Sequence, residues 1–192
     1  MHLLALLGAL TSLATALPTP STTSSSLNQP TQHQKRTCTA IHPPTSQTPR
    51  VYLANRPDIS TVVTQTVTWT LPPDALLPAS GPCTLRARFP SLWEIVDTSV
   101  AKGGAPLPVN VFSETEDQQG LLIGVTTFAS PNKEDNAPSP DGPERVVVVN
   151  SFACKETMTF RFELAGEGEV GFVNGLDEGL GLTGGLEIVY GC

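Results

Sequence analysis

The sequence predicts an all-β protein, an antiparallel β-sandwich or jelly roll of about eight or nine strands that is stapled by disulfides. Apolar and polar residues alternate with period two in several segments, and Gly, Pro, Asn and Asp separate those segments. No segment has a convincing helical repeat. Many short strands between such turns are typical of β-sandwiches and jelly rolls.

The alternation is clearest in residues 61–71, 83–89 and 157–164. In each segment one face is apolar and the other is mainly Thr, Arg or Glu, which predicts a half-buried strand. The predicted inward faces are Val63, Val67, Trp69 and Leu71 in the first segment, Cys83, Leu85, Ala87 and Phe89 in the second, and Met158, Phe160, Phe162 and Leu164 in the third.

Less regular strands are predicted over residues 93–96, 109–112, 121–128, 145–152, 170–173 and 186–192. The four consecutive valines at 146–149 predict a strand that is buried on both faces. In the last strand, Leu186, Ile188, Tyr190 and Cys192 share one side. Two segments are predicted to be long loops, because residues 130–144 are polar and rich in Pro and residues 174–185 are rich in Gly.

Residues 1–16 are expected to be a signal peptide. Their apolar run is too short to span a bilayer, and Ala14-Thr15-Ala16 supplies the small residues needed for cleavage after Ala16. Residues 17–36 are rich in Ser, Thr and Pro and have little apolar surface to bury, which predicts a disordered pro-segment. It ends in Lys35-Arg36, where we expect a kexin-type protease to cut. Residues 37–192 would then form a single β-sandwich domain.

The charge of this domain argues against two classes of partner. The chain has eleven Lys and Arg against eighteen Asp and Glu, and every acidic residue follows residue 36. Loss of Lys35 and Arg36 therefore leaves nine basic residues and a net charge of −9. Because an acidic surface repels phosphate backbones and anionic lipids, we expect neither nucleic acid nor a membrane as partner.

Four cysteines, Cys38, Cys83, Cys154 and Cys192, predict two disulfides in an exported chain. None lies in a Cys-x-x-Cys pair, so we expect no zinc or redox site. Four cysteines allow three pairings. We favour Cys83–Cys154, because Cys83 lies on an inward face and Cys154 follows an apolar strand. The second pair is then Cys38–Cys192, because the ends of compact domains often lie close together.

Three segments resemble the fungal But-two family, the C-terminal domain of the ubiquitin three binding proteins. They are CTLRARFP at residues 83–90, FAC at 152–154 with the following TMTFRFEL, and the terminal glycine-rich turn running into GLEIVYGC. The resemblance covers most of residues 61–192 and implies a secreted or surface-associated β-sandwich without a characterised reaction. The family name comes from a cytosolic partner, a ubiquitin-like-protein activating enzyme, which we do not transfer to an exported chain.

Nucleophilic catalysis is not expected. His42 is the one histidine after residue 36, and the sequence has no Gly-x-Ser-x-Gly motif. We expect His42 to be solvent-exposed and without a catalytic role.

Carboxylates are the other candidate catalytic or metal-binding groups. Two carboxylates could catalyse glycoside hydrolysis if they faced each other across a cleft. A group of neighbouring carboxylates could also bind calcium, although the EF-hand pattern is absent. We expect these acidic runs to be solvated turns. The candidates are Glu94 and Asp97, the cluster Glu114, Glu116 and Asp117, and the pair Asp135 and Asp141.

Two tryptophans could stack on sugar rings. The alternation places Trp69 in the core, whereas the sequence leaves the exposure of Trp93 open. We therefore expect a non-catalytic secreted protein without a cofactor, which acts at the cell wall or extracellularly on an unknown wall glycan or protein ligand. The alternatives are a secreted carboxylate-dependent hydrolase of wall polysaccharide and an effector that binds a protein partner through its loops.

Overall fold

The computed structural model describes residues 37–44, 48–131 and 142–192. The predicted signal peptide, the pro-segment with Ala16, Lys35 and Arg36, and the candidate carboxylates Asp135 and Asp141 lie outside the described residues. Among the described residues, no helix is long and apolar enough to cross a membrane.

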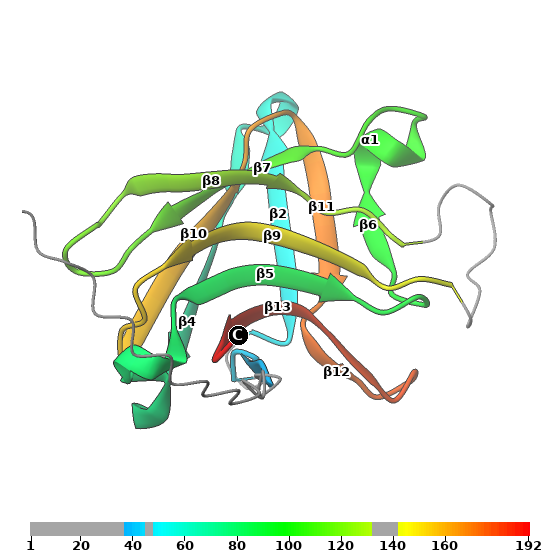
Figure 1. Ribbon diagram of the computed structural model, residues 1–192. Helices are drawn as coiled ribbons and strands as arrows, with labels where there is room; N and C mark the ends of the chain where they lie inside the picture. The colour runs from blue at the N-terminus through cyan, green and yellow to red at the C-terminus, as the bar shows by residue number, and fades with distance from the viewer. Residues whose placement is uncertain (1–36, 45–47, 132–141) are drawn as a thin grey trace, which may run out of the picture. The chain divides into compact units, whose positions relative to one another are not determined.

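The described part of the chain forms three antiparallel sheets, which we name by their central strands (Figure 1). The β13 sheet contains β1 (Thr39–Ile41), β13 (Leu182–Tyr190), β5 (Cys83–Phe89) and β9 (Arg145–Phe152), with β12 (Gly175–Asp177) paired to β13. The β10 sheet contains β4 (Gln65–Thr70), β10 (Thr157–Leu164), β7 (Pro108–Ser113) and β8 (Leu121–Thr127). The β11 sheet contains β3 (Thr61–Val63), β2 (Arg50–Arg56), β11 (Gly168–Val173) and β6 (Ile95–Asp97). The short helix α1 (Thr98–Ala101) and the 3-10 turns Pro57–Ile59, Pro73–Leu76 and Pro78–Ser80 connect them.

One hydrophobic core lies between two layers of strands. In Figure 1, β13, β5, β9 and β8 run across the front, and β2, β10 and β11 cross behind them. All three sheets contribute fully buried side chains to this core, among them Leu53, Trp69, Leu85, Phe160 and Ile188. The predicted all-β antiparallel fold is confirmed, and so is the placement of Trp69 in the core.

The described residues form thirteen strands instead of the eight or nine predicted, partly because one predicted strand is divided. Residues 61–71 alternate without a break, but the chain leaves the β11 sheet after β3 and enters the β10 sheet at β4. Thr64, between them, belongs to neither strand. Sandwiches make their corners with strands that change sheets in this way, and both halves keep the same inward alternation.

The sequence predicts that the valine run of β9 is buried on both faces, and this prediction is wrong. Val146 and Val148 are 41% and 59% exposed. Both lie opposite Arg88 and Arg86 of β5, on the outer face of the sheet. Only the other face of β9 looks toward the core, because no further layer of described residues covers these valines. The Asn150 side chain donates to the Ile123 carbonyl over 2.7 Å and so ties β9 to β8 of the neighbouring sheet.

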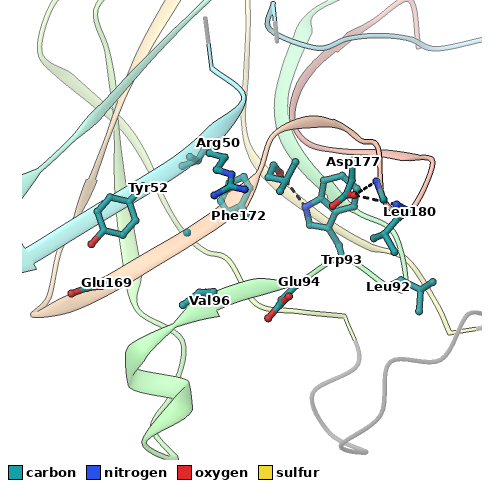
Figure 2. Close-up of a pocket in the computed structure, with 14 residues that line it drawn as sticks. Arg50, Tyr52, Leu92, Trp93, Glu94, Val96, Glu169, Phe172, Asp177 and Leu180 are labelled. Atoms are coloured by element: carbon teal, nitrogen blue, oxygen red, sulfur yellow. Dashed lines mark hydrogen bonds between the residues drawn. The ribbon is translucent and has the colours of Figure 1, made fainter. Parts of the chain in front are cut away.

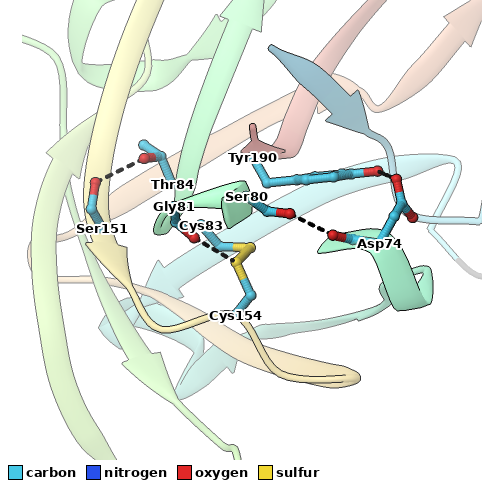
Figure 3. Close-up of a disulfide and its surroundings, with 8 residues drawn as sticks. All are labelled: Asp74, Ser80, Gly81, Cys83, Thr84, Ser151, Cys154 and Tyr190. Atoms are coloured by element: carbon cyan, nitrogen blue, oxygen red, sulfur yellow. Dashed lines mark hydrogen bonds between the residues drawn. A yellow bond between two sulfur atoms is a disulfide. The ribbon is translucent and has the colours of Figure 1, made fainter. Parts of the chain in front are cut away.

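Both disulfides are those that the sequence analysis favours, Cys38–Cys192 and Cys83–Cys154. Each joins positions beside a strand pair. Thr39, one residue after Cys38, lies opposite Tyr190, two residues before Cys192. Cys83 lies opposite Phe152, two residues before Cys154. Figure 3 shows Cys83–Cys154 at this end of β5 and β9, where Thr84 and Ser151 also share a hydrogen bond of 2.8 Å.

The predicted loop at residues 174–185 is wrong, because this segment contains β12 and the beginning of β13 as a hairpin. Asn174 fixes its base from a buried position: its Oδ1 accepts from the Leu186 amide at 2.7 Å, and its Nδ2 donates to the Thr48 carbonyl at 3.2 Å. Gly185 lies against this side chain with φ +94°, and a Cβ there would collide with Asn174 Oδ1. Glycine at 185 therefore serves packing rather than loop flexibility.

Candidate functional site

One depression on the described surface is a groove of about 670 Å³ on the outer face of the β11 sheet (Figure 2). This volume lies within the range of sites for small ligands, about 300–1,000 Å³. Its floor comes from β2 and β11. One wall is the segment that leads into β6, and the other is the tip of the β12–β13 hairpin. The exposed lining residues are Arg50, Tyr52, Glu94, Val96, Gly179 and Leu180.

A missing side chain opens the floor of the groove. Gly171 of β11 pairs with Tyr52 on one side and with Val96 on the other, so these three residues form one row across the outer face. Tyr52 and Val96 are exposed, but the middle position carries no side chain. The edge of the Tyr52 ring borders this position, because a Cβ on Gly171 would lie 3.4 Å from Tyr52 Cδ2.

Charged groups lie near the hydroxyl of Tyr52 at the edge of the groove. Desolvation and a hydrogen bond to Glu169 raise the pKa of the Tyr52 hydroxyl. Glu169 in turn accepts from Arg56 Nη1 at 2.6 Å, and Arg56 also binds Asp58. The hydrogen bonds from Arg56 and Tyr52 lower the pKa of Glu169, so its carboxylate stays ionised. The groove therefore contains an exposed aromatic ring with an ionised carboxylate near its hydroxyl group.

Two charged side chains in the groove have no partner within the described part of the chain. Neither Arg50 nor Glu94 makes a hydrogen bond or an ion pair there through its side chain. The third acid, Asp177, is occupied, because its Oδ1 accepts from the amides of Gly179 and Leu180 at 2.9 and 3.1 Å. Arg50 and Glu94 are thus the charged groups that remain free to bind a ligand.

Neither candidate tryptophan is a surface platform. Trp69 is in the core, and Trp93 is only 3% exposed beneath the groove wall. The Trp93 indole donates to the Val173 carbonyl at 3.1 Å, which fixes the ring against β11 (Figure 2). Sequence reasoning did not single out Tyr52. The signal was available, because Val51 and Leu53 alternate with Tyr52 in a run that reads as a half-buried strand.

The acidic cluster after β7 is a solvated turn, as expected. Glu114 accepts from Arg161 Nε at 2.8 Å, Asp117 pairs with Lys155, and Glu116 is exposed. Within residues 37–44, 48–131 and 142–192, no group of three His, Cys, Asp or Glu side chains could hold a metal ion. This turn therefore offers neither a pair of free carboxylates nor a metal site.

The two carboxylates of the other pair, Glu94 and Asp97, have different roles. Glu94 lies in the groove, whereas Asp97 is buried and caps α1. The Asp97 carboxylate accepts from the amides of Ser99 and Val100 through Oδ1 and from Leu107 through Oδ2, at 2.9–3.1 Å. Three main-chain donors on one buried carboxylate mark a structural cap.

The prediction that His42 is solvent-exposed is wrong. Its side chain is 24% exposed, and its Nε2 lies 3.4 Å from Oε2 of Glu187, which is fully buried in β13. Alternation placed Glu187 on the polar side of its strand, but Arg86 and Arg88 of β5 and the segment around His42 cover that side. Arg86 Nε donates to Glu187 Oε1 at 2.7 Å, and Arg88 Nε lies 3.7 Å from Oε2.

Stability should fall on mild acidification because of His42. Burial lowers its pKa and the positive charge of Arg88 lowers it further, against the opposite effect of Glu187. The unfolded chain takes up a proton near the ordinary pKa of about 6.5, whereas the folded chain resists it, so acidification favours unfolding. We expect the free energy of unfolding, measured by urea titration, to decrease between about pH 7 and pH 5.

His42→Asn is the control for this pH dependence, because asparagine does not titrate. The carboxylates whose pKa is lowered, Asp58, Asp117 and Glu169, lose their contribution below about pH 4 and so lie outside this window. An equally steep decrease in wild type and His42→Asn would contradict the assignment to His42.

Two comparisons with known proteins find no relative. No protein-family model matches the chain, and no curated protein does either. The resemblance to the But-two family therefore stays a prediction, and the groove has to be interpreted from its own chemistry.

Proposed function

We propose that this chain is a secreted, non-catalytic binding protein that acts at the cell wall or elsewhere outside the cell, and that the groove on the β11 sheet is its binding site. The row Tyr52–Gly171–Val96 carries the proposal, because an exposed aromatic ring and an exposed apolar side chain flank an open floor. Two disulfides indicate an oxidising, extracellular environment, which supports secretion.

The carboxylates favour binding over hydrolysis. A glycosidase needs one carboxyl group whose pKa is raised, so that it can act as an acid. In the groove, Arg56 and Tyr52 lower the pKa of Glu169, and Asp177 is occupied by main-chain amides. Glu94 alone is free, and one carboxylate does not supply both the acid and the base. Wall hydrolysis therefore remains the less favoured alternative.

Filling the floor tests the binding role without weakening the fold. Valine at 171 would occupy the open position and push against Tyr52, while a β-branched residue suits a strand better than glycine. We expect Gly171→Val to reduce retention on isolated cell-wall fractions at least tenfold and to leave the melting temperature unchanged or higher. Retention of the secreted protein is measured by sedimentation with each fraction.

Gly166→Val is the matched control, because a Cβ there meets only Leu107 Cδ2 at an ordinary 3.7 Å, in the turn before β11. It should be retained like wild type. If Gly171→Val is retained as well as Gly166→Val, the groove is not the binding site and the proposal fails.

A further inference from the structure

We infer that the groove takes a neutral saccharide, which stacks on Tyr52 and binds Arg50 and Glu94 through its hydroxyl groups. This inference rests on the proposed binding role of the groove and names its ligand class. Four features carry it: the aromatic platform, the two free charged groups, the overall charge, and the occupied edge of β6.

Tyr52 has the properties of a stacking platform. It is 45% exposed, and the edge of its ring lies beside Gly171. A pyranose ring has a face of C–H groups that packs on such a ring, because aromatic faces carry negative charge and apolar area together. Little conformational entropy is lost when a ligand stacks on a tyrosine, because its side chain has only two torsions.

Arg50 and Glu94 complement the rim of a sugar. Arg50 is two residues from Tyr52 on the same face of β2, a separation of about 7 Å along a strand. Its planar fork donates two parallel hydrogen bonds, and the Glu94 carboxylate accepts two. Neighbouring hydroxyl groups of a sugar both donate and accept, so one donor group and one acceptor group suit them. A ligand that offers only one sign of charge would satisfy one of these two side chains and oppose the other.

The charge of the domain selects a neutral sugar over an acidic one. The residues from 37 onward carry a net charge of −9, and Glu94, Glu169 and Asp177 all line the groove. A glycan rich in uronate or phosphate would approach against this field. Glu94 would also lie beside its anionic groups.

An extended peptide is disfavoured at this site. A peptide that extends the β11 sheet needs free main-chain groups on an edge strand, and β6 is the edge strand of that sheet next to the groove. The Ser130 hydroxyl already bonds both outward groups of Ile95, accepting from its amide at 3.0 Å and donating to its carbonyl at 3.3 Å. The part of the edge that borders the groove is therefore occupied by the chain itself.

Titration of soluble oligosaccharides tests the inference on the full chain secreted from a eukaryotic host. The probes are laminarihexaose, cellohexaose, chitohexaose and mannohexaose, with hexagalacturonate as the acidic comparison. Binding is followed by calorimetry and by the fluorescence of Trp93, which lines the groove. We expect at least one neutral probe to bind at least tenfold more tightly than hexagalacturonate.

Variants connect this binding to the groove. Tyr52→Ala should weaken it at least tenfold, and Glu94→Gln several-fold, because the amide loses one acceptor. Val148→Ala, an exposed site on β9, should bind like wild type. The saccharide inference is overturned if no neutral probe binds, or if Tyr52→Ala binds as tightly as Val148→Ala. If Gly171→Val still loses its retention on wall fractions in that case, the groove binds another ligand class and the proposed function stands.

Discussion

Replacing Cys83 and Cys154 together with serine should abolish secretion of folded protein. The bridge closes a loop of 71 residues, and such a cross-link contributes up to about 4 kcal/mol by restricting the unfolded chain. Net stabilities of domains are about 5–15 kcal/mol, so this loss is a large fraction of the total. Cys83 is also fully buried among core residues, where a serine hydroxyl would lack water. The readouts are the amount of protein in the medium and its thermal unfolding.

The second bridge separates two explanations for this effect. Cys38–Cys192 closes a longer separation, 154 residues, so loop entropy alone predicts that its loss costs more. Both of its cysteines are exposed, however, beside the ends of β1 and β13. Because burial adds to the cost at Cys83, we expect the Cys38→Ser/Cys192→Ser variant to be secreted in the larger amount. Greater loss of secretion in that variant would show that loop length outweighs burial.

Strands with one face on the core were predictable from the sequence. In β5 and β10 every second side chain is buried, so the alternation alone identifies both the strand and its inward face. The disulfide that joins Cys83 to Cys154 follows from the same pattern, because it places Cys83 among the inward residues. These features depend on which face of a single strand is turned toward the core and which toward water.

Features that depend on several strands were not predictable. The valines of β9 are a strong burial signal, but their exposure depends on whether another layer covers the sheet. The alternation predicts that Glu187 is exposed, but Arg86 and His42 cover its side chain. The groove combines Tyr52, Gly171 and Val96 from three distant segments, and strand pairing brings them into one row. Pairing and register arise from contacts far apart in sequence, which period-two patterns do not encode.

Removing the buried carboxylate of Glu187 should destabilise the β13 sheet strongly. Glu187 is fully buried in β13, and the guanidinium groups of Arg86 and Arg88 lie 2.7 and 3.7 Å from its oxygens. Breaking a buried ion pair from one side costs about 3–5 kcal/mol, because the remaining charge keeps its desolvation penalty. The two arginine side chains are 27% and 29% exposed, so they can turn partly to water. We expect Glu187→Ala to lower the free energy of unfolding by about 3 kcal/mol in urea titration.

Arg88 supplies an internal control for this prediction, because it contacts two carboxylates. Its Nη1 lies 3.3 Å from Glu144, whose side chain is 54% exposed. Water solvates both partners of that pair, so Glu144→Ala should change the free energy of unfolding by less than about 1 kcal/mol. Equal destabilisation of the two variants would show that the number of charges around Arg88, and not the burial of the carboxylate, determines the loss in free energy of unfolding. A cost confined to Glu187→Ala would instead identify its buried carboxylate as the group that holds β5 and the segment around His42 against β13.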